Sequence, residues 1–397
     1  MWRWLGPGVL VAVGYMDPGN WATGIEAGSA YGYELGWVIL LSSGAAILLQ
    51  IAAARLGLAT QTDLVGLGYK FFGARIGHFL AFTAFVAVVA TDLAEVLGFA
   101  LALHLLVGLP LGLGAVLALV ETVLILYWVQ RRPILLEALI GALTLAILAI
   151  FVYEFWLLRP PVKAVLSGFL PSALVWRDVE ALYLALGLVG ATIMPHNLYL
   201  HSGWVRGRFS GSLASQFQHT TRDTIRSLLI AFFVNASLLI TAATLSRASE
   251  GVAARWGIQE AYRLLAPAVG SAASLAFGLA LLLSGHNATL TTTLTGQIVL
   301  EYLLPRTFSP QARSFLLRSS SLLPALVAIL VWGESHLSAI LVFSQVLLSL
   351  QLPFVLLPML YFLHKIPQVQ WSGGLSLLTY VISFSILGLN LYLLLRL

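Results

Sequence analysis

Long apolar runs, separated by short polar connections, occupy almost the whole chain. Eleven of them are long enough to cross a bilayer as helices. They cover approximately residues 5–30, 36–57, 77–105, 111–129, 133–157, 181–204, 225–246, 270–300, 315–333, 338–362 and 374–396. The runs are continuous and lack the alternation, over about ten residues, that barrel strands show. This pattern predicts an all-α integral membrane protein without a separate soluble domain.

Composition supports the same class. Of the 397 residues, 59% are hydrophobic and only 9% are charged, whereas a soluble domain carries about 25% charged residues. The chain has no cysteine, which excludes disulfides and thiolate metal sites. The net charge of +5 lies in the connections and does not indicate nucleic-acid binding. No cofactor is expected.

The basic residues predict an orientation. If the N-terminus lies inside, about two thirds of the 21 Lys and Arg residues fall on the inner side of the membrane. An odd number of spans then puts the C-terminus outside. The compact connections favour a bacterial protein, and therefore the cell inner membrane with a cytoplasmic N-terminus and an external C-terminus.

Two of the predicted spans contain matched interruptions. Residues 17–20 of the first span read Asp-Pro-Gly-Asn, and residues 194–197 of the sixth read Met-Pro-His-Asn. Proline breaks a helix by removing a backbone donor, and the freed groups must line a cavity enclosed by protein. A proline kink would explain one break, but two breaks at corresponding places of inverted halves predict a transporter with its binding site at mid-membrane.

The residues at these breaks suggest a metal ion as cargo. Asp17 has no basic residue near the middle of its span, and a carboxylate there costs about 2.5–3.5 kcal/mol. Asn20 adds a second hard oxygen. Met194 occupies the position that matches Asp17, and its soft thioether favours transition metals over calcium and magnesium. Ala191 can offer a carbonyl if the helix breaks there, and Gln345 can complete the site from the tenth span.

Other ionisable residues in the spans suggest a proton route. Asp92 and Glu95 share one face of the third span, and two neighbouring carboxyls in a low dielectric do not both ionise easily. A relay and a structural pair remain equally open, and Arg318 is a plausible counter-charge. His196 and His201 are five residues apart and do not share a helix face, so a joint metal site is not expected. Each histidine either relays protons or lines a polar channel.

Five stretches of the chain resemble the Nramp (natural resistance-associated macrophage protein) family of divalent metal transporters. They read "LGPGVLVAVGYMDPGNWAT", "ATDLAEVLGFALAL", "GATIMPHNLYLHS", "LTGQIVLE" and "FSQVLLSLQLPF". The resemblance implies a LeuT-like fold of two inverted five-helix repeats, 1–157 and 181–364, with an external connection at 158–180 and an eleventh helix at 374–396. It also implies uptake of Mn²⁺ or Fe²⁺, usually with protons.

The resemblance assigns roles residue by residue. Metal ligation falls to Asp17, Asn20, Met194, the carbonyl of Ala191 and, in some conformations, Gln345. The residues that match those linked to proton passage are Asp92, Glu95, His196, His201 and Arg318. The expected partners are divalent metal ions, protons and the lipid bilayer, and the expected state is a monomer.

The chain also departs from the family pattern. Gly24 stands where an Asp is expected, and residues 285–289 read GHNAT instead of GQSST, which leaves the type of ion coupling open. Glu121 lies mid-span without an evident partner. A magnesium-transporting relative on the same fold is the alternative, against which Met194 argues. An intramembrane metalloprotease would need a cluster such as His-Glu-x-x-His, so no enzyme activity is expected.

Overall fold

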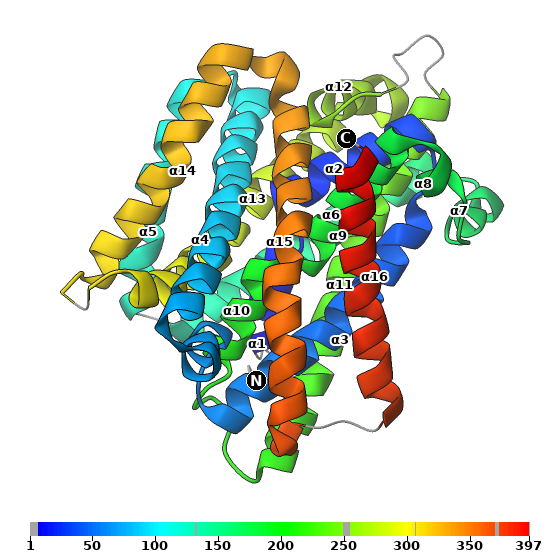
Figure 1. Cartoon of the computed structure of the whole chain (residues 1–397). Coiled ribbons are helices and arrows are strands. Elements are labelled where there is room, and N and C mark those ends of the chain that lie inside the picture. The colour runs from blue at the N-terminus through cyan, green and yellow to red at the C-terminus, as the bar shows by residue number, and fades with distance from the viewer. Residues whose placement is uncertain (1–6, 132, 249–254, 306, 370–372, 397) are drawn as a thin grey trace.

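The computed structural model of the chain is a bundle of helices (Figure 1). It describes residues 7–131, 133–248, 255–305, 307–369 and 373–396, and their side chains except those at 122–139, 310 and 335. Residues 1–6, where the first span was predicted to begin, lie outside this description, as do Arg132 and Arg306. Within the described ranges the chain contains helices and no strand.

The helices are, in chain order, α1 (Pro7–Gly14), α2 (Pro18–Tyr31), α3 (Gly36–Thr60), α4 (Leu64–Val107), α5 (Leu111–Arg131), α6 (Pro133–Leu158), α7 (Val162–Gly168), α8 (Leu174–Arg177), α9 (Val179–Ile193), α10 (Pro195–Trp204), α11 (Leu213–Ala248), α12 (Ile258–Val269), α13 (Ser271–Leu303), α14 (Pro310–Trp332), α15 (Leu337–Lys365) and α16 (Gly373–Arg396). Two short 3-10 turns, Glu334–His336 and Pro367–Val369, precede and follow α15.

Nine stretches of the described chain are long and apolar enough to cross a membrane. One of them joins α9 and α10 into a single broken span. The first predicted span is divided into α1 and α2, and the fourth corresponds to α5, whose described apolar part is Leu111–Glu121. The predicted spans are therefore found as helices, and the two predicted breaks are found at the predicted prolines.

Several predicted connections contain helix. α4 begins at Leu64, where Asp63 accepts a hydrogen bond from the backbone N–H of Gly66 at 2.9 Å, and it turns at Gly73, whose φ is 78°. α11 begins inside the predicted connection 205–224. α12, within the connection 247–269, buries one apolar side against the bundle. A span-length search for apolar runs misses such helices because their helical sequence is polar or amphipathic.

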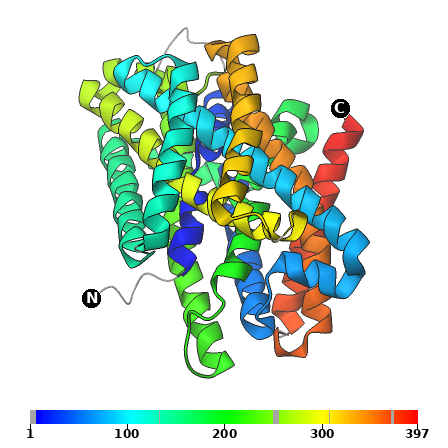
Figure 2. The same cartoon turned by 90° about the vertical axis from the view of Figure 1, so that its left-hand side faces the viewer.

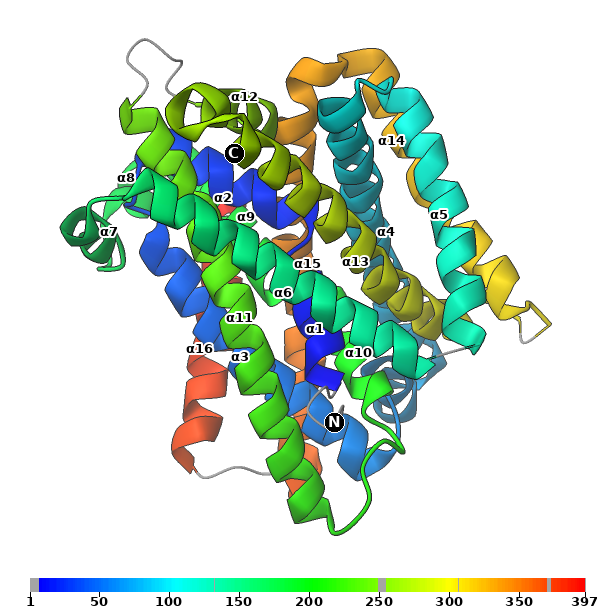
Figure 3. The same ribbon diagram turned by 180° about the vertical axis from the view of Figure 1, so that it is seen from behind.

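The broken helices lie at the centre of the bundle. α1, α2, α9 and α10 are surrounded by the long helices α3, α4, α11, α13 and α15 (Figures 1 and 3). α5 and α14 pack together at one edge, and α16 packs against α15 at the other (Figures 1 and 2). The two breaks are therefore enclosed by protein, as backbone groups without helical partners require in a membrane.

Two glycines allow backbone-to-backbone contact beside the second break. A Cβ on Gly190 of α9 would lie 1.9 Å from the carbonyl oxygen of Gln345 in α15. A Cβ on Gly57 of α3 would lie 2.0 Å from the carbonyl oxygen of Ser202 in α10. Only glycine permits these distances, so the first half of the broken helix is fitted to α15 and the second half to α3.

Candidate metal-binding site

The first break places two polar side chains, Asp17 and Asn20, in the protein interior. Asp17 caps α2, and its Oδ1 accepts a hydrogen bond from the backbone N–H of Asn20 at 2.8 Å. The Nδ2 of Asn20 donates to the carbonyl of Tyr15 at 2.6 Å. Oδ2 of Asp17 and Oδ1 of Asn20 are buried and have no hydrogen-bond partner among the described residues. Such groups are costly unless a ligand satisfies them, which suits a cation.

The second break provides a carbonyl and a thioether. Pro195 has no N–H, so the carbonyl of Ala191 loses the donor that a continuous helix would supply. Met194 has φ 46° and ψ 91°, a conformation that costs a residue other than glycine about 1–3 kcal/mol. Its side chain is fully buried. Strain of this kind persists where the surrounding structure holds a functional geometry in place.

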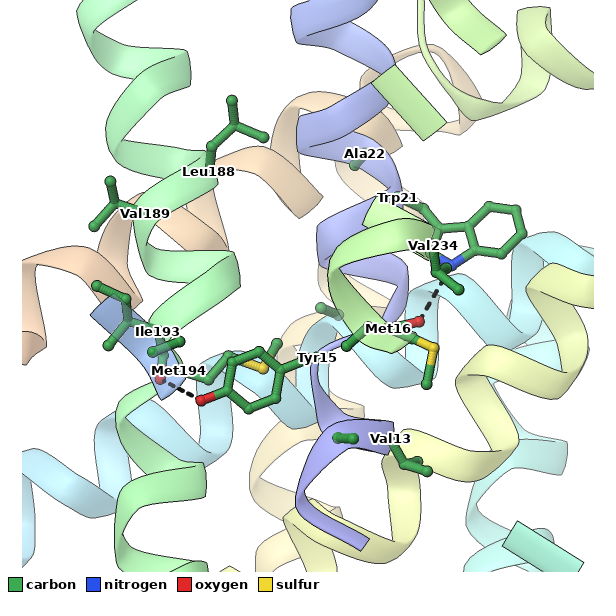
Figure 4. Close-up of a cluster of buried hydrophobic side chains, with 14 of the residues drawn as sticks. Val13, Tyr15, Met16, Trp21, Ala22, Leu188, Val189, Ile193, Met194 and Val234 are labelled. Atoms are coloured by element: carbon green, nitrogen blue, oxygen red, sulfur yellow. Dashed lines mark hydrogen bonds between the residues drawn. The ribbon is translucent and has the colours of Figure 1, made fainter. Parts of the chain in front are cut away.

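Side-chain contacts join the two breaks. Figure 4 shows Tyr15 of the first break donating to the carbonyl of Ile193, beside Met194, at 3.2 Å. Asn197 lies against both breaks. Its Nδ2 is 3.4 Å from the sulfur of Met194, and a Cβ on Gly14 would lie 2.4 Å from the same Nδ2. Asp17 and Met194 are 177 positions apart in the sequence. The two motifs that contain them therefore meet in space.

Gln345 reaches the first break from α15. A Cβ on Gly19 would lie 1.8 Å from its Nε2, so the amide rests directly on the glycine of the Asp-Pro-Gly-Asn motif. The Oε1 of Gln345 is buried and has no hydrogen-bond partner in the described part of the chain. The five predicted metal ligands thus come from the two breaks and from the helix that packs on both of them.

The donor set of this site is mixed. It consists of one carboxylate, two amide oxygens, a backbone carbonyl and a thioether. No ion pair involves Asp17, and no group of three or more His, Asp or Glu side chains is arranged for a metal, within the described ranges. A single negative charge with neutral oxygens and one soft sulfur matches a divalent ion of borderline softness.

Three of the predicted proton residues form a buried cluster beside this site. Asp92 and Glu95 lie on one face of α4, and the guanidinium of Arg318 from α14 contacts both, with Nη2 3.7 Å from Oε2 of Glu95. The hydroxyl of Thr292 in α13 donates to Glu95. The salt bridge that the sequence left open is therefore present, and it is fully buried.

The two histidines face different helices, as their spacing predicts. Nδ1 of His196 is 3.0 Å from Oγ1 of Thr91, the residue before Asp92 on α4. Nδ1 of His201 is 3.0 Å from Oε1 of Gln50 on α3. The Nε2 atoms of both rings are buried and have no hydrogen-bond partner within the described residues. His196 is therefore adjacent to the carboxylate cluster, and His201 is not.

Sequence reasoning missed several residues that hold the first break. Nε2 of Gln50 donates to the hydroxyl of Tyr15 at 2.8 Å, which links His201 to the second break through Tyr15. Asn235 of α11 donates to the carbonyl of Tyr15 at 2.9 Å, and Ser284 of α13 donates to that of Met16. Each is a polar residue within an apolar run, which was the only available signal.

Comparison with known proteins agrees with this architecture. The family model described as natural resistance-associated macrophage protein-like matches residues 8–396. The divalent metal cation transporter MntH of Xylella fastidiosa is 45% identical over 361 residues, covering 90% of this chain and 76% of the relative. MntH of Xanthomonas campestris pv. campestris is 44% identical over 398 residues, covering 98% of this chain and 89% of the relative.

Solved structures show the same fold. A variant of the Eremococcus coleocola manganese transporter aligns with a TM-score of 0.80 at 30% identity, covering 99% of this chain and 94% of that one. Mhp1, a nucleobase-cation-symport-1 family transporter, aligns at 0.64 with 17% identity, covering 93% and 80%. MhsT aligns at 0.65 with 14% identity, covering 97% and 98%. These likenesses confirm the predicted all-α, LeuT-like fold, and the chain belongs to the natural resistance-associated macrophage protein family.

Proposed function

We propose that this protein imports divalent transition-metal ions, Mn²⁺ or Fe²⁺, by alternating access around the site between the two broken helices. The observation that carries the proposal is that Asp17, Asn20 and Gln345 each have one buried oxygen without a hydrogen-bond partner among the described residues, at the break that Asn197 joins to Met194. The names of the MntH relatives and of the Eremococcus coleocola manganese transporter support the same cargo.

Each ligand has a distinct part in this proposal. Asp17 supplies the charge that draws a divalent cation into a low-dielectric site. Asn20, Gln345 and the carbonyl of Ala191 replace water oxygens around the ion. Met194 supplies the soft donor, which strengthens the binding of transition metals more than that of Ca²⁺ or Mg²⁺. Selectivity is then a difference between affinities that the thioether enlarges.

Protons enter the proposal at two places. A carboxylate ligand must lose its proton before it binds a metal, so metal and proton compete for Asp17. The cluster of Asp92, Glu95 and Arg318 provides a proton route apart from the metal, and His196 extends it through Thr91. His201 is proposed to take part through Gln50 and Tyr15. These contacts support a proton-coupled mechanism.

The membrane placement is also part of the proposal. The distribution of Lys and Arg supports a cytoplasmic N-terminus and an external C-terminus in the cell inner membrane. We propose the inverted repeats 1–157 and 181–364, with 158–180 as the external connection and 374–396 as the additional span. The protein is proposed to act as a monomer in the lipid bilayer, without enzymatic activity.

Uptake by the purified protein in proteoliposomes tests this function. Mn²⁺, Fe²⁺, Ca²⁺ and Mg²⁺ are supplied separately, with and without an imposed pH gradient that is acidic outside. We expect entry of Mn²⁺ and Fe²⁺, acceleration by the gradient, and little entry of Ca²⁺ or Mg²⁺. Transport of Mg²⁺ at the same rate as Mn²⁺ would favour the magnesium-transporting alternative. A rate of metal uptake that does not change with the pH gradient would contradict proton coupling.

A further inference from the structure

An apolar groove runs between α3, α9 and α16 at the edge of the bundle (Figure 1). It has a volume of about 440 Å³, within the range of roughly 300–1,000 Å³ that ligand pockets occupy. Among the residues that line it, only Trp37, Ser42 and Ser385 carry a polar atom in the side chain. Ser42 uses its hydroxyl within its own helix, where it donates to the carbonyl of Val38 at 2.6 Å. The groove therefore suits a hydrocarbon ligand.

One side of the groove opens at the lipid-facing surface. Leu41 of α3 and Val381 of α16 line it and are 57% and 52% exposed, whereas Ile193 of α9, which also lines it, is 1% exposed. In a membrane-spanning bundle, apolar side chains on the outside of the helices contact lipid tails, which are as apolar as leucine. The bilayer therefore supplies what fills this groove.

The length of the groove matches one leaflet of the bilayer. Leu182 and Ile193 both line it and lie 11 positions apart on α9, so the groove follows this helix for about 16 Å. The hydrocarbon core of a bilayer is about 30 Å thick, which gives about 15 Å for one leaflet. Because Ile193 precedes the break at Met194, an acyl chain that enters near the start of α9 reaches the middle of the membrane.

Two arginines lie at the end of the groove where α9 begins. Val175 lines the groove, and α8 continues with Trp176 and Arg177. The ring of Trp176 lies 5.6 Å from that of Tyr392, which packs on groove-lining residues of α9 and α16. The guanidinium of Arg396 lies 5.2 Å from the centre of the Tyr392 ring and donates to its hydroxyl. Tryptophan and tyrosine are enriched at the level of the lipid headgroups, so this end of the groove is placed at the membrane surface.

The charges of these arginines are available to a ligand. Neither forms an ion pair within the described ranges of the chain. The neighbouring carboxylates have other partners, since Asp178 accepts a hydrogen bond from Tyr31 at 2.7 Å and Glu180 contacts Arg255. Positive charge at one end of an apolar groove complements the phosphate that follows the acyl chains of a phospholipid.

We propose that this groove binds one acyl chain of an anionic phospholipid, whose phosphate is held by Arg177 and Arg396. The chain covers the lipid-facing side of α9, the first half of the second broken helix. A zwitterionic phospholipid has the same chains and the same phosphate, but it adds an ammonium group that the two arginines repel. The site therefore discriminates by headgroup charge, and binding of the preferred lipid stabilises the folded protein.

Native mass spectrometry of the whole protein in detergent tests this site. Dioleoyl-phosphatidylglycerol is compared with dioleoyl-phosphatidylcholine, which has identical chains, and with glycerophosphoglycerol, which has the headgroup alone. We expect one phosphatidylglycerol per chain, bound at least about 10-fold more tightly than phosphatidylcholine, and no retention of the headgroup alone. Equal affinity for the two lipids would overturn the proposal.

Variants of α16 test the place of the acyl chain. Ser385→Trp fills the groove from an exposed position that lines it, and this variant should lose the tightly bound phosphatidylglycerol. Phe384→Trp is the matched control, because Phe384 is 57% exposed at the same depth and does not line the groove. Retention of phosphatidylglycerol by Ser385→Trp with wild-type affinity would contradict the assignment. Val381→Trp fills the groove from a second exposed position and covers the case in which Ser385→Trp does not fold.

Variants of the arginines test the place of the headgroup. An arginine near the membrane surface strengthens binding of an anionic lipid about 5-fold. Arg177→Gln with Arg396→Gln should therefore weaken phosphatidylglycerol about 25-fold and weaken phosphatidylcholine less. An unchanged affinity for phosphatidylglycerol in this double variant would refute the role of the arginines.

Thermal unfolding supplies an independent readout. Added phosphatidylglycerol should raise the Tm of the wild type and of Phe384→Trp, and it should leave the Tm of Ser385→Trp unchanged. The Tm in detergent alone shows whether each variant is folded. The competing occupant of this face is a second copy of the chain. A dimer that persists without phosphatidylglycerol and dissociates in Ser385→Trp would overturn the lipid assignment.

Discussion

Replacing Gly19 with alanine is expected to push Gln345 out of the metal site while the fold stays intact. The added methyl carbon would lie 1.8 Å from Nε2, 2.4 Å from Cδ and 3.0 Å from Cγ of Gln345, and these are its three nearest neighbours. All three belong to a side chain that can rotate, so the backbone need not move. Alanine also favours the helix by about 0.5–1 kcal/mol relative to glycine.

The size of the effect follows from these distances. Carbon and a neighbouring heavy atom approach to about 3.5 Å, so the amide of Gln345 has to move by roughly 1.5–2 Å. Ligand distances to a metal tolerate a deviation of only about 0.2 Å. Gln345 is then lost as a ligand, and water takes its place. For one neutral oxygen we expect Mn²⁺ binding to weaken about 10-fold, or about 1.4 kcal/mol.

Calorimetry on four proteins measures this effect: the wild type, Gly19→Ala, Gln345→Ala and the double variant. Because both substitutions remove the same ligand, the double variant should bind Mn²⁺ no more weakly than either single variant. Gly44→Ala in α3 is the control, since a Cβ there meets nothing within 4 Å. Wild-type affinity in Gly19→Ala, or losses that add in the double variant, would refute the assignment of Gln345 to the site.

Three further substitutions separate the roles of the remaining residues. Asp17→Asn should abolish Mn²⁺ uptake in proteoliposomes without loss of folded protein, because it removes the only charged ligand; transport at the wild-type rate at any pH would contradict this. Met194→Ala should reduce uptake of Mn²⁺ and Fe²⁺, reduce that of Cd²⁺ more, and admit Ca²⁺ or Mg²⁺ in competition assays. An equal loss for all ions would mean that the thioether only packs. Glu95→Gln should change proton flux or the voltage dependence of uptake with little change in metal affinity, and loss of Mn²⁺ binding in calorimetry would assign Glu95 to the metal site or to folding.

The paired breaks could be predicted because their signal is local. A proline, a glycine and polar side chains within four positions of an apolar run disturb a helix wherever it packs. Asp17 and Met194 stand out for the same reason, since their chemistry is unusual at that depth. The apolar helices and the family also follow from local patterns, namely hydropathy and short motifs.

Contacts between helices could not be predicted in this way. The partner of Glu121 is His286, 165 positions away, and Tyr15 meets Gln50 and the carbonyl of Ile193. Such pairs depend on how far each helix is rotated about its own axis and on the angle at which it crosses its neighbours. Neither quantity can be deduced from the sequence of one helix alone. The helical start of α11 was missed because its polar sequence lies beyond the apolar run.

The backbone contacts of Gly190 and Gly57 have a consequence for the second broken helix. Gly190 brings α9 against the backbone of α15, and Gly57 brings α3 against the backbone of α10, while α9 also packs on α3 and α10 on α13 and α4. A larger residue at either glycine would force these backbones apart, so we expect the two contacts to fix how each half of the break sits on its neighbours. Met194 joins the two halves in a backbone conformation with positive φ. If the proposed alternating access bends the helix at this residue, the sulfur lies at the bend, where displacement is smallest, and can stay beside the ion.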